Sequence, residues 1–427
     1  MKVLLISNVP LKMDNSMGNT LLNLLGNLEN VELASIYTRS GTPDPEIADA
    51  FCITERMLIK NLLQKTPAGI RVQSPGADCI RHSETEDRKI LRFVKSSRWT
   101  IFFWMQDLVW KLGRWKSPEL EQFVKDFSPD IVLTVLINSA CLNNLILHVL
   151  SLTQAKFILY AWDNNYSLKM PAYSPLRWIK RLIDRVSMRK VVQKAALFYV
   201  ISDMQKEEYE KCFRRSCKVL TKGADFEEQP VFKEQYHDPL QLVFTGNIAM
   251  NRWKSLKMIA DVLENINRHG IRAQLRIYTA TPLTEKMKKA LHRGESSILM
   301  GSVPAREIPE IQRNADILVH AEAFDMANRL RVRHSFSTKI VDYLKAARLI
   351  LAVGPKNVAS IDHLIRNDCA IIADNKLELE EKIRDILNDF AKLDSITRNA
   401  YDCGCKYHNK QDIQEMLLQD LNDLCEK

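Results

Sequence analysis

Short apolar runs alternate with amphipathic stretches along most of this 427-residue sequence, and this alternation restricts the fold more than any other feature. Each run is long enough for one buried strand, and the stretches between them have the spacing of apolar residues that is typical of helices. Alternating strands and helices favour a parallel sheet covered by helices on both faces. The predicted strands are residues 2–9, 31–38, 129–136, 155–163 and 195–202, followed by 240–248, 273–280, 297–303, 315–322, 349–353 and 369–373.

The alternation is interrupted by a polar, turn-rich segment at residues 226–239. We therefore predict two doubly wound, Rossmann-like α/β domains, residues 1–225 and 240–410, joined by this segment as a linker. Residues 411–427 are predicted as a C-terminal helix that can pack back on the first domain. The chain length also favours two domains. Because ligands bind at the carboxyl ends of the strands in such folds, we expect the two domains to face a cleft that holds the site.

The composition is that of a globular protein, with 46% hydrophobic and 26% charged residues. No apolar run approaches the roughly 20 residues that span a bilayer. The apolar start at residues 2–9 is too short for a signal peptide and is better explained as a first strand. The nine cysteines are scattered and odd in number, so we expect reduced thiols and a cytoplasmic protein. Cys403 and Cys405 have no second pair of ligands near them in sequence, and we expect no metal site.

Basic residues are concentrated in two stretches of this chain, whose net charge is +9. Arg98–Lys116 and Leu176–Lys190 combine lysine and arginine with aromatic and aliphatic side chains at helical spacing. Such stretches are typical of helices that lie on a membrane surface, although packing in the core or against a protein explains the same pattern. Basic and aromatic residues together can also bind nucleic acid, which we do not expect here. We predict peripheral binding to the inner face of the cell membrane.

The segment from His334 to Pro355 gives the clearest indication of a ligand. Ser337 and Thr338 are candidate N-caps of a helix, and Lys339 follows them. Free first-turn amides, two hydroxyls and a lysine suit a phosphate group. Asp342, one turn later, could bind a pair of sugar hydroxyls. A capped helix packed on a sheet explains the same sequence without a ligand, but it requires neither Lys339 nor Asp342.

Three other positions could contribute to the same kind of site. Gly246 ends a predicted strand and would let the backbone approach a ligand closely, and Arg252 near the next helix start could neutralise a diphosphate. Gly18 lies in a loop after the first strand that could supply amides. Each of the three is also compatible with an ordinary turn. We assign Asp163, at a strand end in the first domain, to the acceptor side.

Three segments resemble a known family: "LVFTGNIAMNRWKSL", "GSVPAREIPEIQRNADILVHAE" and "SFSTKIVDYLKAARLILAVGP". Together they are similar to the donor domain of GT-B glycosyltransferases, and especially to bacterial enzymes like those of glycosyltransferase family four, which build capsular, exo- or O-antigen polysaccharides. The resemblance covers residues 240–373 and is weaker in the first half of the chain. It implies the GT-B fold, retention of configuration, and no metal or other cofactor besides the donor substrate.

The resemblance also implies roles for individual residues. The acid on the site helix of the family binds the donor ribose, the start of that helix approaches the diphosphate, and a basic residue neutralises the same phosphates. Backbone groups that follow another strand of the donor domain contact the nucleotide base, and a glycine of the first domain lies opposite the sugar. The matching positions are Asp342 for ribose, Ser337, Thr338, Lys339 and Arg252 for the diphosphate, Gly301 and Val303 for the base, and Gly18 for the sugar.

The chain departs from the family at one site position. The family has two glutamates eight positions apart, and the first of them falls on His334. Glu322, at the end of the preceding strand, is expected to take over, so Glu322, His334 and Asp163 are our candidate catalytic residues. We predict a hexosyltransferase that moves a sugar from a nucleotide-diphosphate donor to a polysaccharide or lipid-linked oligosaccharide acceptor. A nucleotide-sugar epimerase of the same fold and a non-catalytic assembly partner remain the alternatives.

Overall fold

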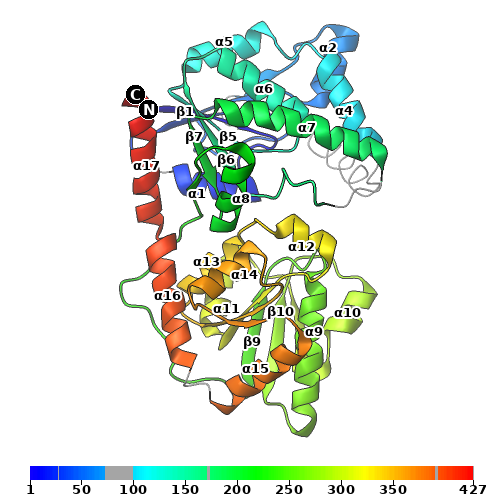
Figure 1. Cartoon of the computed structure of the whole chain (residues 1–427), viewed down its shortest axis with the longest axis vertical. Coiled ribbons are helices and arrows are strands. Elements are labelled where there is room, and N and C mark those ends of the chain that lie inside the picture. The colour runs from blue at the N-terminus through cyan, green and yellow to red at the C-terminus, as the bar shows by residue number, and fades with distance from the viewer. Residues whose placement is uncertain (27, 73–99, 171–173, 390–392, 427) are drawn as a thin grey trace. The chain divides into compact units, whose positions relative to one another are not determined.

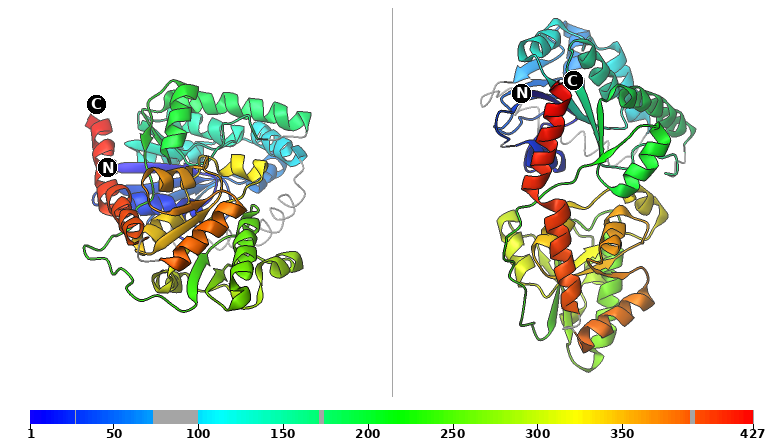
Figure 2. Two further views of the ribbon diagram at one scale, coloured as in Figure 1. Left: turned by 60° about the horizontal axis from the view of Figure 1, so that its bottom comes forward. Right: turned by 60° about the vertical axis from the view of Figure 1, so that its left-hand side comes forward.

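The computed structural model describes residues 1–26, 28–72, 100–170, 174–389 and 393–426. The chain divides into two compact units (Figure 1). Unit 1 consists of Met1–Leu220 together with Ile413–Lys427, and unit 2 consists of Thr221–Asp412. Each unit has a mainly parallel sheet with helices on both faces (Figures 1 and 2). The two sheets confirm the predicted fold class of two Rossmann-like α/β domains.

Unit 1 contains an eight-stranded sheet in which only the β3–β4 pair of the described strands is antiparallel. The five strands predicted in this part of the sequence are present, and three additional strands of two to four residues were too short to be recognised by periodicity. In sheet order the strands are β4 (Ile70–Val72), β3 (Asp49–Cys52), β2 (Glu32–Tyr37), β1 (Lys2–Ser7), β5 (Ile131–Val135), β6 (Lys156–Ala161), β7 (Leu197–Val200) and β8 (Lys218–Val219).

The helices of unit 1 cover this sheet and begin at well-formed caps, such as Ser139 before α6 and Ser202 before α8. The last helix, α17, is fastened to the edge of the sheet, where Asp420 accepts hydrogen bonds from the Tyr199 hydroxyl at 2.5 Å and from Lys218 at 2.7 Å. The helices are α1 (Ser16–Leu25), α2 (Glu55–Gln64), α4 (Thr100–Leu112), α5 (Pro118–Phe127), α6 (Ala140–Ser151), α7 (Pro175–Lys194), α8 (Asp203–Phe213) and α17 (Lys410–Glu426).

Unit 2 contains a six-stranded parallel sheet, and all six strands were predicted. Successive strands run outward from β9 in one direction and then from β12 in the other, so the topological switch point lies between β9 and β12. Ligands of doubly wound folds bind at the carboxyl ends of the strands near this point. In sheet order the strands are β11 (Ser297–Gly301), β10 (Ala273–Tyr278), β9 (Leu240–Thr245), β12 (Ile317–Ala321), β13 (Leu349–Val353) and β14 (Ile371–Ala373).

The central strands of unit 2 are buried on both faces, as in β13, where all five residues are buried. Amphipathic helices cover the two faces, and α13 buries four of its eight residues. The helices are α9 (Arg252–Ile266), α10 (Glu285–Leu291), α11 (Ile308–Asn314), α12 (Met326–Val332), α13 (Thr338–Lys345), α14 (Ala359–Arg366), α15 (Lys376–Asn388) and α16 (Asp394–His408). Among the described helices of the chain, none has the length and hydrophobicity needed to cross a membrane.

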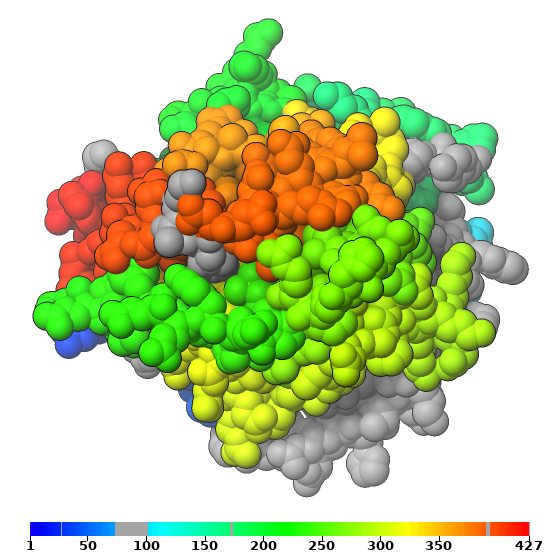
Figure 3. Space-filling model, turned by 90° about the horizontal axis from the view of Figure 1, so that it is seen from below, coloured from blue at the N-terminus to red at the C-terminus, as the bar shows by residue number. Residues whose placement is uncertain are grey.

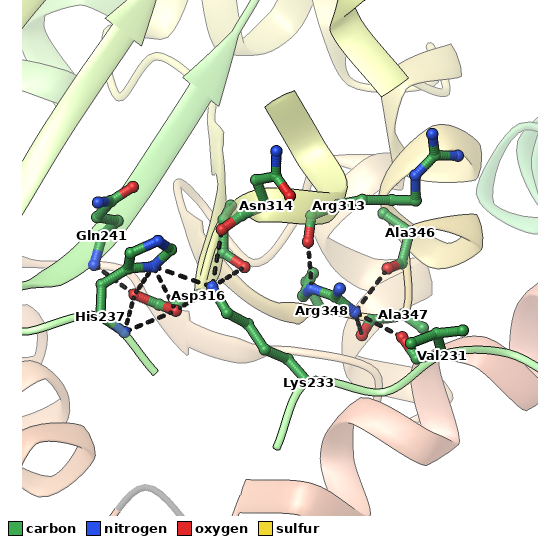
Figure 4. Close-up of polar contacts among 11 residues, drawn as sticks. Val231, Lys233, His237, Gln241, Arg313, Asn314, Asp316, Ala346, Ala347 and Arg348 are labelled. Atoms are coloured by element: carbon green, nitrogen blue, oxygen red, sulfur yellow. Dashed lines mark hydrogen bonds and ion pairs between the residues drawn. The ribbon is translucent and has the colours of Figure 1, made fainter. Parts of the chain in front are cut away.

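The segment predicted as a linker lies along the surface of unit 2, where Figure 3 shows it in green. It is held by the buried carboxylate of Asp316, which accepts hydrogen bonds from Lys233 at 2.6 Å, from the backbone of Gln241 at 2.7 Å and from the His237 ring at 3.0 Å (Figure 4). These contacts lie at the amino ends of β9 and β12. They fix the segment at the edge of the sheet opposite the expected site.

A buried arginine holds the same segment at a second point. Arg348 donates hydrogen bonds to the backbone carbonyls of Val231 at 2.8 Å, Arg313 at 2.7 Å and Ala347 at 2.8 Å (Figure 4). The planar guanidinium can satisfy several carbonyls at once, which a lysine in its place could not do with the same geometry. The segment is therefore an integral part of unit 2.

Candidate functional site

The candidate site of unit 2 is built around the carboxyl end of β9. Gly246 follows this strand with φ at +130°, a backbone conformation that favours glycine. A Cβ atom at this position would collide with the side chain of Lys339, which lies across the glycine and over the ring of Phe244, 5.1 Å from its centroid. Gly246 therefore creates the space that brings Lys339 of α13 to the end of β9.

Arg252 and Glu322 form an ion pair in which two hydrogen bonds join the side chains. Arg252, the first residue of α9, donates from Nε and Nη2 to the two carboxylate oxygens of Glu322, both at 3.0 Å. Glu322 follows β12, its side chain is 3% exposed, and its backbone carbonyl accepts from the Ser255 hydroxyl at 2.6 Å. The guanidinium has further N–H groups, so Arg252 is positioned by Glu322 and can still bind an anion.

Lys339 and Arg252 place two positive charges close together in a partly buried environment. Burial, and to a smaller extent the charge of Arg252, lower the pKa of Lys339 to about 8, while the charges of Glu322 and Asp342 act in the opposite direction. His320, in β12, is 3.7 Å from Glu322, and burial lowers its pKa to about 4, so its ring is neutral at pH 7. Because two neighbouring cations repel one another, an anionic ligand that contacts both would be bound favourably.

This arrangement predicts that the affinity for a nucleoside diphosphate depends on the protonation of Lys339. A bound diphosphate raises the pKa of the lysine above its value of about 8 in the free protein, so binding takes up a proton at and above that pH. We expect full affinity below pH 8 and a decrease as the pH rises through 8. Calorimetry on both sides of pH 8 measures this dependence. Lys339→Met should bind more weakly without this pH dependence, and an unchanged profile in that variant would contradict the assignment.

The start of α13 presents backbone amides beside Lys339. Ser337 is the N-cap residue, as predicted, but its side chain does not cap the helix, and its own N–H donates to the Ser360 hydroxyl at 3.0 Å. Within the described residues the amides of Thr338 and Lys339 have no hydrogen-bond acceptor. Free amides at a helix start bind phosphate groups well.

Asp342 lies one turn along α13 from these amides. Burial raises the pKa of its carboxyl group, while the nearby charge of Lys222, and to a smaller extent those of Lys345 and Lys339, act to lower it. Among the described residues its carboxylate has no hydrogen-bonding partner. A half-buried acid of this kind can accept hydrogen bonds from the two hydroxyls of a sugar.

Tertiary structure thus brings together five of the predicted residues of this unit, Gly246, Arg252, Glu322, Lys339 and Asp342. The predicted base-contacting residues lie farther along the same edge of the sheet. Gly301 ends β11, two strands from β9, and is exposed with φ at +82°; Val303 follows it. His334 is fully buried in the segment between α12 and α13.

The two predicted residues of unit 1 lie in a helix that follows β1 and in the segment directly after β6. Gly18 is in the first turn of α1, where a Cβ atom would collide with the backbone of Lys12, and its amide donates to the Asn15 side chain at 2.8 Å. Asp163 follows β6 and is exposed, and its backbone carbonyl accepts from Gln205 at 3.1 Å. Arg98, the first residue of a predicted membrane-binding stretch, and its neighbour Trp99 lie outside the described residues.

Sequence reasoning missed the residues that support the end of β9. The Thr245 hydroxyl accepts from Gln312 of α11 at 2.9 Å and lies 3.4 Å from the Tyr343 hydroxyl, which donates to the Val319 carbonyl at 3.2 Å. Lys222, whose charge acts on Asp342, was also missed. These partners come from separate elements and leave no local pattern. In the described segments, no group of three or more His, Cys, Asp or Glu side chains is arranged to hold a metal ion.

Comparison with known proteins gives one family match. Residues 239–389 match the family described as glycosyl transferases group 1. The matched range includes every residue of the site around Lys339. The chain matches no curated protein.

Solved structures match over nearly the whole chain. HepE from Anabaena, determined in complex with UDP, aligns with a TM-score of 0.66 and 12% identity over 99% of this chain and 100% of HepE. Sucrose-phosphate synthase from Thermosynechococcus elongatus gives a TM-score of 0.61 at 12% identity over 99% and 98% of the two chains. A glycosyltransferase from Rickettsia africae gives 0.60 at 12% identity with the same coverage. The chain therefore has the GT-B fold, its residues 239–389 are similar to the glycosyl transferases group 1 family, and the two findings together support a glycosyltransferase.

Proposed function

We propose that this chain transfers a sugar from a nucleoside diphosphate to a polysaccharide or lipid-linked oligosaccharide acceptor. The convergence of Arg252 and Lys339 beside the free amides of α13 is the observation that carries the proposal. Two cations and a helix start are suited to a diphosphate, and Asp342, one turn away, is suited to the ribose hydroxyls of the same nucleotide. HepE, which shares the fold, has been determined with UDP and with UDP-glucose, so uridine nucleotides are the first donors to test.

The chemistry required of the site is stabilisation of the departing diphosphate. Negative charge develops on the leaving group as the sugar departs, and Arg252, Lys339 and the α13 amides are positioned to stabilise it without reorganisation. We propose that these fixed groups replace a metal ion and that the sugar is transferred with retention of configuration. Glu322 is buried and bound to Arg252, so we assign it to the positioning of that arginine.

The acceptor is proposed to bind to unit 1. Asp163 is exposed after β6, at the carboxyl end of the sheet, where ligands of Rossmann-like units bind. A polysaccharide or lipid-linked acceptor would place the enzyme at the inner face of the cell membrane, as a peripheral protein of polysaccharide biosynthesis in bacteria. The resemblance to family-four enzymes supports this acceptor class.

Replacing Asp342 with alanine tests the donor site directly. We expect calorimetry to show binding of one nucleoside diphosphate to the wild type and about 10- to 100-fold weaker binding to Asp342→Ala, because the ribose loses hydrogen bonds to a charged acceptor. Asp402→Ala, which removes an exposed acid of α16, serves as the matched control and should bind normally. Since Asp342 has no bonded partner among the described residues, the unfolding temperature should stay nearly constant in both variants.

Other outcomes of the same experiment would point to the alternatives. If no nucleoside diphosphate or nucleotide sugar binds to the folded wild type, the chain is a non-catalytic member of the fold. Conversion of a nucleotide sugar in the absence of any acceptor would identify an epimerase. Equal affinity in the wild type and Asp342→Ala would show that the ribose is bound elsewhere.

A further inference from the structure

The first part of helix α7 of unit 1, residues 175–187, has its polarity reversed relative to an ordinary surface helix, whereas the remainder buries Met188, Val191 and Val192 in the usual way. Its apolar residues Leu176, Ile179, Leu182, Ile183 and Val186 are between 41% and 57% exposed. The buried residues of the same helix include Lys180, Arg181, Asp184 and Ser187. A surface helix of a soluble protein normally buries its apolar stripe and exposes its charges. The outer side of α7 is therefore shaped for contact with something other than water.

A buried ionic cluster explains how the polar side of α7 is accommodated. Lys180 contacts Asp184 on its own helix and Asp107 of α4, the latter at 3.1 Å. Asp184 also accepts from the backbone of Ala140 at the start of α6, and the Cys141 thiol donates to Asp107 at 2.9 Å. Buried charges of this kind require such partners. The cluster joins α4, α6 and α7, so the exposed apolar sides of α4 and α7 belong to helices that are bonded to each other.

Helix α4 carries a second exposed apolar stripe next to α7. Ile101, Met105, Leu108 and Leu112 recur at helical spacing and are 47% to 57% exposed. On its other side α4 contacts α2, where Glu55 accepts hydrogen bonds from Gln106 at 2.6 Å and from Trp110 at 3.0 Å.

Helix α2 extends the apolar surface with Ile59, Leu62 and Leu63, the last 77% exposed. Figure 1 shows α2, α4 and α7 on one side of unit 1. We call the exposed apolar side chains of these three helices the three-helix face.

Charge is segregated on the same three helices. Each helix has a single acid, and these acids, Glu55, Asp107 and Asp184, are all held in the hydrogen bonds and ion pairs beneath the face. Of the basic residues of these helices, Lys180 and Arg181 are buried and Arg185 is half-buried. The exposed basic residues are Arg56, Lys60, Lys111, Arg177, Arg189, Lys190 and Lys194. Among the described residues of these three helices, the exposed charges are therefore all positive and accompany exposed apolar side chains, a combination that fits the headgroup region of an anionic bilayer.

We propose that the three-helix face is a preformed docking surface for a bilayer that contains anionic phospholipids. The proposal deepens the proposed function and rests on it, because a membrane-bound acceptor is what would require the enzyme to dock. Its apolar residues enter the interface, and the surrounding arginines and lysines contact lipid phosphates. The sequence pointed to the α4 and α7 stretches, whereas α2 and the outward direction of the apolar side chains are visible only in the folded chain.

Vesicle flotation of the full-length protein tests the proposal. We expect binding to vesicles of phosphatidylcholine with phosphatidylglycerol and little binding to phosphatidylcholine alone. The triple variant Leu108→Ser, Ile179→Ser, Leu182→Ser should lose binding, while Leu377→Ser, which removes an 81%-exposed leucine of α15 in unit 2, should retain it. Lys111→Gln with Arg177→Gln should weaken binding about fivefold for each charge removed.

Measurement of UDP affinity for the same variants separates this proposal from the proposed function. Unchanged nucleotide binding in a triple variant that no longer floats would support docking, provided that its circular-dichroism spectrum and thermal unfolding match those of the wild type and so show that unit 1 is folded. A wild type that binds nucleotide but ignores both vesicles would overturn docking alone. Equal flotation with neutral vesicles would overturn the requirement for anionic lipid. A concentration-dependent dimer that the triple variant abolishes would assign the face to a second copy of the chain instead.

Discussion

Replacing Arg252 with alanine is expected to destabilise the protein by about 3–5 kcal/mol and to abolish most of the binding of a nucleoside diphosphate. The loss of stability follows because Glu322, 3% exposed, would remain as a buried charge without its partner. Binding is lost because the variant lacks the guanidinium that Glu322 positions to bind the phosphates. Chemical denaturation measures the first effect, and calorimetry with UDP measures the second.

A second substitution separates the two effects of losing Arg252. In the double variant Arg252→Ala, Glu322→Gln, the buried negative charge is removed, so much of the stability should return while nucleotide binding stays weak. Glu322→Gln alone should weaken binding by a smaller factor, because Arg252 is present but less firmly positioned. Normal UDP affinity in the folded Arg252→Ala protein would show that the ion pair is purely structural.

Replacing Asp316 with alanine is expected to cost about 3–5 kcal/mol of stability without changing donor affinity. The carboxylate is fully buried and accepts from Lys233, His237 and the backbone amide of Gln241, and among the described residues only Lys233 would keep another acceptor, the Asn314 carbonyl. Because these contacts lie at the amino ends of β9 and β12, the site at the opposite ends of the strands should keep its geometry. Thermal unfolding and UDP calorimetry on the same preparation test both statements.

An exposed ion pair of the same unit provides the control for Asp316. Asp394 and Arg398 are paired on α16 with side chains 47% and 56% exposed, and Asp394→Ala should cost less than about 1 kcal/mol. Added salt should weaken that exposed pair and affect the buried contacts of Asp316 much less. A small effect of Asp316→Ala, similar to that of Asp394→Ala, would show that the segment around Lys233 contributes little to the stability of unit 2.

The fold of unit 2 was predictable because its signal is local. A strand such as Leu349–Val353 is buried along its whole length and is therefore a continuous apolar run in the sequence. In unit 1 the same reasoning missed β3, β4 and β8, which have two to four residues and are too short for any periodicity. It also missed α2, whose exposed leucines do not form a buried stripe.

Much of the candidate site was predictable for a related reason. Gly246 and Arg252 lie just after β9 and at the start of the next helix, and Lys339 and Asp342 lie in the first turns of α13; in a parallel sheet such positions meet at one edge. A glycine, two basic residues and an acid at such positions were enough to predict a site for a phosphate group beside a sugar. The roles of single residues were not predictable to the same extent, because nothing in the sequence indicated that Glu322, a candidate catalytic residue, is paired with Arg252.

The sequence by itself therefore determined the class of fold, the strands of unit 2 and the sheet edge at which the candidate site residues lie, since these depend on patterns over a few neighbouring residues. Only the tertiary structure decided the pairing of Arg252 with Glu322, 70 positions away, the lowered pKa of Lys339 next to that arginine, and the outward direction of the apolar side of α7. Each of these depends on which elements pack together, and partners distant in sequence leave no periodic signal.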